Sequence, residues 1–214
     1  APIIQTGAGR FLADGGNIEF GTGSSVTGGT IESANSGFCF TTGSVLFDSV
    51  ANLATPLNVN LGSTLSVAGL GLINDGTINL NPQNSSLNGI LLYTQNGTLG
   101  GTGQVNLLTS FDNSQINTDP GVSISHAASH TIAGAGQINA AMINAGTIAA
   151  DSSISFGGID ALELQTNDKT NSGLMEARAS SVLQIDGITI DQTGGGEIAA
   201  NGGTVSFFLA DNAV

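Results

Sequence analysis

Short alternations of apolar and polar residues run through almost the whole chain. They have the two-residue period of β-strands, and clusters of Gly, Asn, Asp and Ser separate them. Such clusters supply turns and positive φ angles. Residues 172–184 are the only fair helical candidate, and they alternate well enough to form a strand instead. The pattern predicts strands over residues 76–81, 103–108, 146–151, 152–156, 161–166, 181–187 and 203–208.

One phrase is written three times. Thr98–Asn106 reads TLGGTGQVN, and Thr131–Asn139 reads TIAGAGQIN. A weaker copy, TLSVAGLGLIN, occupies Thr64–Asn74. We interpret the phrase as one corner of the fold that returns at the same face on a later turn. Its glycines, Gly103 and Gly136 among them, are then expected to need a positive φ or a close approach of backbone.

A shorter phrase, Gly-Thr-aliphatic or a near variant, opens many of the strands, and its copies recur at the irregular, short intervals of a solenoid repeat. One or two inward aliphatic residues per strand cannot form a core alone. Copies stacked at about 4.8 Å would join them into a continuous ladder. The sequence therefore predicts an all-β parallel β-helix, with a β-sandwich or jelly roll as the alternative. The residues expected to point inward on parallel strands are Ile78, Leu99, Ile132, Ile148 and Val205.

Length and composition fit one such domain. The prediction is a single β-helix over residues 1–214, in which an irregular N-terminal segment over residues 1–28 is the alternative to a regular start. Hydrophobic residues make up 40% of the chain and charged residues 9%, so the chain can bury a core and is not of the disordered type. No apolar run approaches the roughly 18 residues that span a bilayer, and no membrane insertion is expected.

The chain carries 16 acidic and 3 basic residues, which gives a net charge of −13. Binding of nucleic acid needs clustered Lys and Arg, so nucleic acid is excluded as a partner. A uniform negative charge keeps molecules apart in solution. The scarcity of Lys and Arg also suits a protein that meets proteases outside the cell.

The text from His130 to Asp151, HTIAGAGQINAAMINAGTIAAD, followed by SSISF, resembles the repeats of large secreted bacterial β-helix proteins. These include autotransporter passenger domains and filamentous haemagglutinin-like adhesins. The resemblance covers roughly residues 60–210 and is a style of repeat that many families share. It implies a right-handed β-helix, export from a bacterial cell, and a role at the cell surface or in a matrix.

Residues that could carry chemistry are few. Cys39 lies between two Phe residues in GFCFTTG and is predicted to be a small buried hydrophobe. His126 and His130 have the i, i+4 spacing of a metal pair but no evident third ligand, so exposed or hydrogen-bonded loop histidines are expected. Asp112 and Asp119 could form an acid pair, although the sequence around Asp119 is more simply a turn. No catalytic, metal or cofactor site is expected, and the protein is predicted not to be an enzyme.

The sequence thus favours a non-enzymatic structural protein, located outside the cell or at its surface, as a β-helical subunit of a fibre, adhesin or matrix. Both terminal segments are apolar and lack capping signals, so the expected partner is a second copy, bound head to tail. Surface glycans are a second class of partner. The alternative function is a carbohydrate-binding or carbohydrate-processing β-helix, which a cluster of aromatic residues on one outer face would favour.

Overall fold

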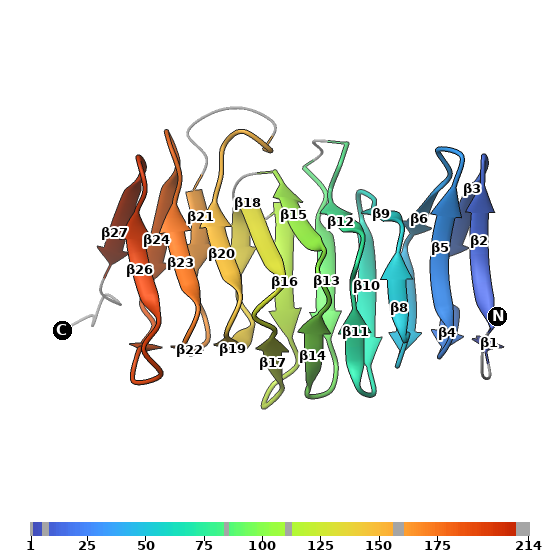
Figure 1. Cartoon of the computed structure of the whole chain (residues 1–214), viewed down its shortest axis with the longest axis horizontal. Helices are drawn as coiled ribbons and strands as arrows, with labels where there is room; N and C mark the ends of the chain where they lie inside the picture. The colour runs from blue at the N-terminus through green and yellow to red at the C-terminus, as the bar shows by residue number, and fades with distance from the viewer. Residues whose placement is uncertain (1, 6–8, 84–85, 110–112, 156–160, 209–214) are drawn as a thin grey trace.

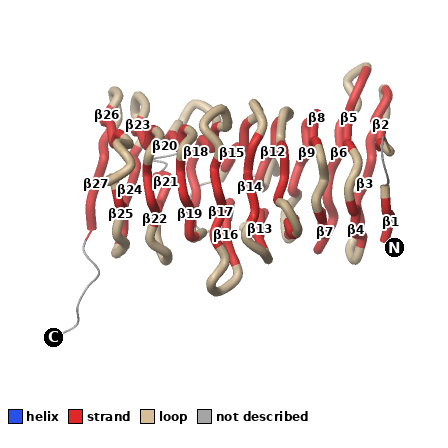
Figure 2. The backbone as a smooth tube through the Cα atoms, turned by 60° about the horizontal axis from the view of Figure 1, so that its bottom comes forward, coloured by secondary structure: helices blue, strands red, loops and turns tan. Residues whose placement is uncertain are grey.

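The computed structural model describes residues 2–5, 9–83, 86–109, 113–155 and 161–208. In these residues the chain forms 27 β-strands and no α-helix. The strands stack along the long axis of the molecule in the order of the sequence, from the N-terminus at one end to the C-terminus at the other (Figure 1). Figure 2 shows the same stack as short strands joined by loops and turns. No helix in the described residues could span a membrane.

Each turn of the chain adds one strand to each of three faces, and there are about nine turns. Face 1 contains β1 (Pro2–Ile4), β4 (Ser24–Thr27), β7 (Ser44–Asp48), β10 (Ser63–Ala68), β13 (Gly89–Tyr93), β16 (Ser114–Thr118), the second half of β18 (Thr131–Ile138), β21 (Ala161–Leu164), β24 (Val182–Asp186) and β27 (Thr204–Phe208). Face 2 contains β2 (Arg10–Asp14), β5 (Thr30–Ala34), β8 (Asn52–Ala54), β11 (Gly71–Ile73), β14 (Gly97–Gly100), β17 (Ser123–His126), β19 (Ala141–Asn144), β22 (Lys169–Asn171) and β25 (Ile190–Asp191). Face 3 contains β3 (Asn17–Gly21), β6 (Phe38–Thr42), β9 (Pro56–Val59), β12 (Thr77–Leu80), β15 (Gln104–Leu108), the first half of β18, β20 (Thr147–Ala150), β23 (Leu174–Ala177) and β26 (Glu197–Ala200).

Every strand pairing among the described residues is parallel. Parallel neighbours need a crossover instead of a hairpin, which excludes the sandwich and the jelly roll. The fold is the parallel β-helix that the sequence predicted. The length of a turn varies along the molecule: the turn that leads from Ile78 to its partner Val105 is much longer than the turn from Ile132 to its partner Ile148.

The core is a set of side-chain ladders that run along the inside of the three faces. Of the five residues predicted to point inward, Ile78, Leu99, Ile132 and Ile148 are fully buried, and Val205 packs half-buried against the core in the last strand. They do not form one ladder, because Leu99 belongs to face 2 and Val205 to face 1. The complete ladder of face 3 is Ile18, Cys39, Leu57, Ile78, Val105, Ile132, Ile148, Met175 and Ile198.

The repeated phrase does not mark one corner that returns at the same face. Thr64–Asn74 turns from face 1 to face 2, Thr98–Asn106 from face 2 to face 3, and Thr131–Asn139 from face 3 to face 1. The phrase therefore encodes a corner of the coil in general, and each of the three corners uses it once. An aliphatic residue enters the core on each side of the bend, and the glycines between them allow it.

The explanation of the glycines is confirmed, with a different cause at each site. Gly136 has a φ of +143°, which side chains rarely adopt. Gly103 has no positive φ, but an added Cβ would lie 2.2 Å from the carbonyl oxygen of Gly76 in the preceding turn. At both positions the backbone of a neighbouring turn lies so close to the corner that a side chain would collide with it.

One of the predicted strands is absent. Residues 152–155 form turns and bends, not a strand, so the chain after Asp151 leaves face 3 instead of extending it. For residues 172–184 the strand alternative is correct: the segment holds β23 and the start of β24, which lie on two different faces. At the N-terminus, β1 to β4 pair within the same three faces as the later strands.

Candidate functional site

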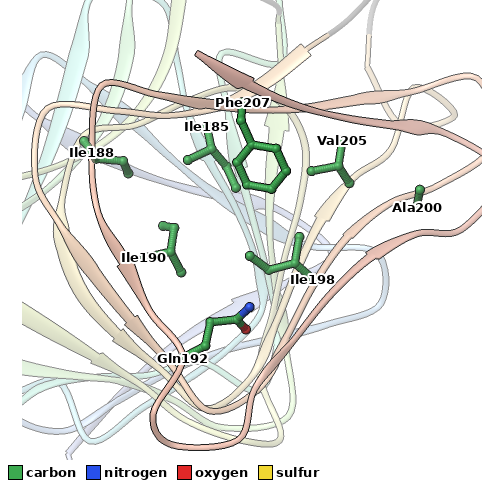
Figure 3. A pocket seen from close by; sticks show the side chains of 8 residues that line it. All are labelled: Ile185, Ile188, Ile190, Gln192, Ile198, Ala200, Val205 and Phe207. Carbon is green, nitrogen blue, oxygen red and sulfur yellow. The ribbon is translucent and has the colours of Figure 1, made fainter. Parts of the chain in front are cut away.

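The C-terminal end of the β-helix is an apolar hollow that no described residue covers. It has a volume of about 530 Å³, and Figure 3 shows the side chains that line it. It is lined by Ile185, Ile188, Ile190, Gln192, Ile198, Ala200, Val205 and Phe207. These are mostly the inward side chains of the last turn, which in a central turn would be fully buried by the turn that follows. Here Phe207 continues the face 1 ladder after Ile185 and is still 67% exposed.

The N-terminal end is open in the same way. Ile3 takes the inward register position that Val26 holds one turn later, yet it is 45% exposed whereas Val26 is fully buried. Phe11 and Ile18 continue the ladders of faces 2 and 3 to this end and are half-buried. Each of the three ladders therefore ends in an apolar side chain at both ends of the molecule.

The backbone at the two ends is complementary. In the described residues β27, β25 and β26 each pair on one side only, with the strand of the preceding turn. The first strands β1, β2 and β3 likewise pair only with the strand of the following turn. Such edges present unpaired N–H and C=O groups. Within each face all strands are parallel to one another. A C-terminal edge strand of one molecule could therefore pair in parallel with the N-terminal edge strand of the same face in a second molecule.

A chain of buried polar side chains occupies the corner between faces 2 and 3. His126 and His130 are each only 1% exposed, so they are not exposed loop histidines, although they are hydrogen-bonded. His126 ends β17 and stacks in register on Asn144 of the next turn, which in turn stacks on Asn171. The i, i+4 spacing is therefore not that of a helix: His126 is the last residue of β17, and His130 lies in the corner that follows, just before β18.

The hydrogen bonds of this chain have one consistent direction. The amide of Asn74 lies 3.0 Å from Nε2 of His130, Nδ1 of His130 lies 3.0 Å from Nε2 of His126, and Nδ1 of His126 lies 2.6 Å from Oδ1 of Asn144. Asn144 donates onward to Asn171 over 2.8 Å, and Asn171 donates to Gln192. Asn74 donates from its NH₂ group at one end of the pair, and Asn144 accepts through Oδ1 at the other. Each ring therefore accepts at Nε2 and donates from Nδ1, so both imidazoles are neutral and carry their proton on Nδ1.

Burial lowers the pKa of both histidines, to about 4 for His126 and about 3 for His130. For His126 the hydrogen bond to Asn144 acts in the opposite direction, and for His130 the neighbouring His126 lowers the pKa further. Among the described residues no group of three or more His, Cys, Asp or Glu could hold a metal ion. The hydrogen bonds of the pair connect Asn74 of an earlier turn with Asn144 of a later one.

Lys169 is a buried cation that the sequence analysis did not single out. It takes an inward position on face 2, between Met142 and Ile190, and is 2% exposed. Its ammonium group donates to the carbonyl oxygens of Asn167 at 2.7 Å and Gln165 at 3.3 Å. Burial lowers its pKa to about 7, which the nearby Asp168 opposes. Its buried ammonium group thus holds the turn before β22 in place through hydrogen bonds to two backbone carbonyl groups.

The remaining candidates have structural surroundings. Cys39 is fully buried in the face 3 ladder as predicted, and burial raises the pKa of its thiol. Asp119 opens a turn in which its carbonyl accepts from the N–H of Val122, and Asp112 lies outside the described residues. Both arginines form ion pairs: Arg10 with Glu32, and Arg178 with Asp151 and Glu176.

Comparison of the chain with known protein families, curated proteins and solved structures finds no match. The likeness to repeats of secreted bacterial β-helix proteins stays a prediction, and the fold and the geometry of the two ends are the basis for a functional proposal.

Proposed function

We propose that the protein is a non-enzymatic structural β-helix of an extracellular fibre, adhesin or matrix, and that its molecules stack head to tail. The observation that carries this proposal is the pair of open ends. At each end three sheet edges and three apolar ladders face solvent among the described residues, and the two ends have matching strand polarity.

The interactions that would stabilise stacking are those that stabilise each added turn within the molecule, namely burial of apolar side chains and pairing of strand edges. Contact of two ends would bury Phe207 and Val205 of one copy and Ile3 of the next, and would pair edge N–H and C=O groups. Because the two ends are different surfaces, the contact is heterologous. The ends lie at opposite ends of the long axis, so repeated contacts would extend the stack as an open filament. A rod with such ends is suited to forming a filament.

The extracellular location is supported by sequence, not by geometry. The chain has three basic residues in 214, and its repeats resemble those of exported bacterial β-helices. Antibody labelling of intact source cells, with and without added protease, tests this part of the proposal. Labelling that requires permeabilised cells would contradict it.

Assembly is tested by sedimentation and electron microscopy of the purified chain over a range of micromolar concentrations. We expect rods whose lengths are multiples of one molecule. Phe207→Asp should prevent them, because it places a carboxylate in the end contact while the exposed ring contributes little to the monomer. Ser206→Asp on the same strand, whose side chain alternates to the outer face, adds the same charge and should leave assembly intact.

A mixing experiment tests the direction of stacking. Phe207→Asp leaves the N-terminal end unchanged, and Ile3→Asp leaves the C-terminal end unchanged. Each variant alone should stay monomeric, and an equal mixture should give dimers but no longer rods. A wild-type chain that is monomeric at every concentration would refute head-to-tail stacking. Dimers of either variant on its own would show that like ends pair instead, and a mixture that stays monomeric while the wild type assembles would contradict a contact between unlike ends.

A further inference from the structure

Face 3 carries a groove on its outer surface, beside the open N-terminal edge. It has a volume of about 410 Å³ and is lined by Asn17, Phe38, Phe40, Asn58, Asn60, Pro82 and Gln83. Its floor is formed by β3, β6 and β9, and one wall comes from the chain after β12. The N–H of Leu61 donates to Oε1 of Gln83 over 3.1 Å and ties this wall to the preceding turn.

Phe38 and Phe40 form the aromatic part of the groove. Cys39 between them is buried, so both phenyl rings lie on the outer side of the sheet, where they are half-buried. Their ring centroids are 6.1 Å apart and their planes are inclined by 42°. Both rings thus lie on the outer face of β6 and not in the core.

Each ring has an asparagine beside it in the register of the sheet. Asn17 of the preceding turn pairs with Phe38, and Asn58 of the following turn pairs with Phe40. Among the residues that the structure describes, no charged side chain lines the groove. Glu19 is the nearest acid in the same register, beside Phe40, and its carboxylate accepts a hydrogen bond from Thr42 at 2.6 Å.

Asn58 ends a directed ladder of amides. The amide of Asn106 donates to Asn79 over 2.9 Å, and Asn79 donates to Asn58 over 2.9 Å. The next position in the register is Phe40, which cannot accept. Among the described residues, the NH₂ group of Asn58 therefore has no protein acceptor, and it lies in the lining of the groove.

We propose that this groove binds a neutral glycan, with two consecutive sugar units lying along β6. The apolar faces of sugar rings pack on aromatic rings, and sugar hydroxyl groups both donate to and accept from amide side chains. The groove offers two rings and an amide beside each, in a concave site with few polar groups at fixed positions. The lack of charge in the lining and the net charge of −13 select an uncharged polymer over an acidic one.

The test is affinity electrophoresis in gels that contain a neutral polysaccharide: hydroxyethyl cellulose, xyloglucan, galactomannan, laminarin or soluble starch. Polygalacturonate serves as the acidic probe. We expect at least one neutral gel to retard the chain and the acidic gel to leave its mobility unchanged.

Two variants connect retardation with the groove. Asn58→Asp keeps an oxygen that accepts from Asn79 and replaces the NH₂ donor with a negatively charged acceptor, so it should weaken retardation at least tenfold. Asn117→Asp makes the same change of charge on face 1 and is the control. The double variant Phe38→Ser/Phe40→Ser should abolish retardation, and circular dichroism shows whether each variant keeps its fold.

Three results would overturn the proposal: no retardation in any neutral gel, stronger retardation by polygalacturonate, or retardation that the folded groove variants leave unchanged. Glycan binding can be tested independently of head-to-tail stacking. The Phe207→Asp variant is expected not to stack, and its substitution leaves the residues of the groove unchanged.

Discussion

At the residue scale, the cost of a substitution depends on which side of the strand it occupies. Ile148 is fully buried and pairs with Ile132 on one side and Met175 on the other. Ile148→Asp would leave a carboxylate without a partner inside this ladder. We expect it to lower the free energy of unfolding by roughly 3–5 kcal/mol.

Thr147→Asp is the matched control, because it adds the same charge one residue earlier on the outer side of β20. Its effect should stay within about 0.5 kcal/mol. Urea unfolding followed by circular dichroism measures both variants. Equal losses of stability in the two would mean that Ile148 is not a core residue.

Glycines can be compared in the same way. At Gly103 an added Cβ would lie 2.2 Å from the oxygen of Gly76 and 2.6 Å from that of Asn74, and both are backbone atoms that cannot rotate away. Gly103→Ala should therefore destabilise the protein by more than about 1 kcal/mol. At Gly16 a Cβ would meet nothing within 4 Å and φ is not positive.

Gly16→Ala is thus expected to be neutral or to stabilise by up to about 1 kcal/mol, since it reduces the freedom of the unfolded chain. Thermal unfolding of the two variants under identical conditions provides the comparison. Similar melting temperatures for both would show that the corner at Gly103 relaxes enough to admit a side chain.

At the element scale, strand type and inward residues could be predicted from the sequence, but the place of each strand could not. Alternation and Gly-Thr-aliphatic phrases report local bending and burial, so inward residues such as Ile78 and Ile132 were identified correctly. Which face a strand joins depends on how much chain each corner and loop consumes. On face 3 alone the turn after Ile78 is much longer than the turn after Ile132, and such uneven turns place three copies of one phrase at three different corners.

The groove on face 3 was missed although its signal was present. Cys39 was predicted to be buried, and the period of two then places Phe38 and Phe40 together on the opposite side of the strand. Because the whole segment is apolar, the sequence analysis treated it as buried and did not assign the two rings to the outer face. Asn58 and Gln83 could not have been assigned to the groove, because their proximity depends on the register of later turns.

The histidine chain predicts a dependence of stability on pH. The pKa values of His126 and His130 in the folded protein, about 4 and about 3, lie below the usual value near 6.5. The unfolded chain therefore binds protons that the folded protein does not. The contribution of the two histidines to stability is complete above about pH 6.5 and falls as the pH drops toward 4, by up to about 1.4 kcal/mol per unit for each histidine.

Urea unfolding between pH 7.5 and 4.5 measures this slope, and the double variant His126→Gln/His130→Gln should show a flatter one. NMR titration of the ring protons gives an independent readout. Ordinary titration of either ring near pH 6.5 in the folded protein would contradict the buried neutral chain.

At the scale of the whole molecule, the protein is a stack in which each turn is stabilised by the turns before and after it. In such a one-dimensional arrangement local opening begins at the ends. The central turns are covered on both sides, whereas β25 to β27 and β1 to β3 are covered on one side only among the described residues. The one-sided pairing on which the proposed assembly rests therefore also predicts that the ends are the least stable of the described parts of the molecule.

Hydrogen exchange followed by mass spectrometry can detect both consequences at once. At low concentration, peptides covering β24 to β27 should exchange much faster than peptides covering β18 to β20. At a concentration where rods form, exchange of the terminal peptides should slow, because a second copy would pair the free edge of β27, while exchange in the central turns stays constant. The Phe207→Asp variant should remain fast at both concentrations. Exchange at β27 that is slow and independent of concentration would mean that this end is covered within a single molecule, and that stacking is not what protects it.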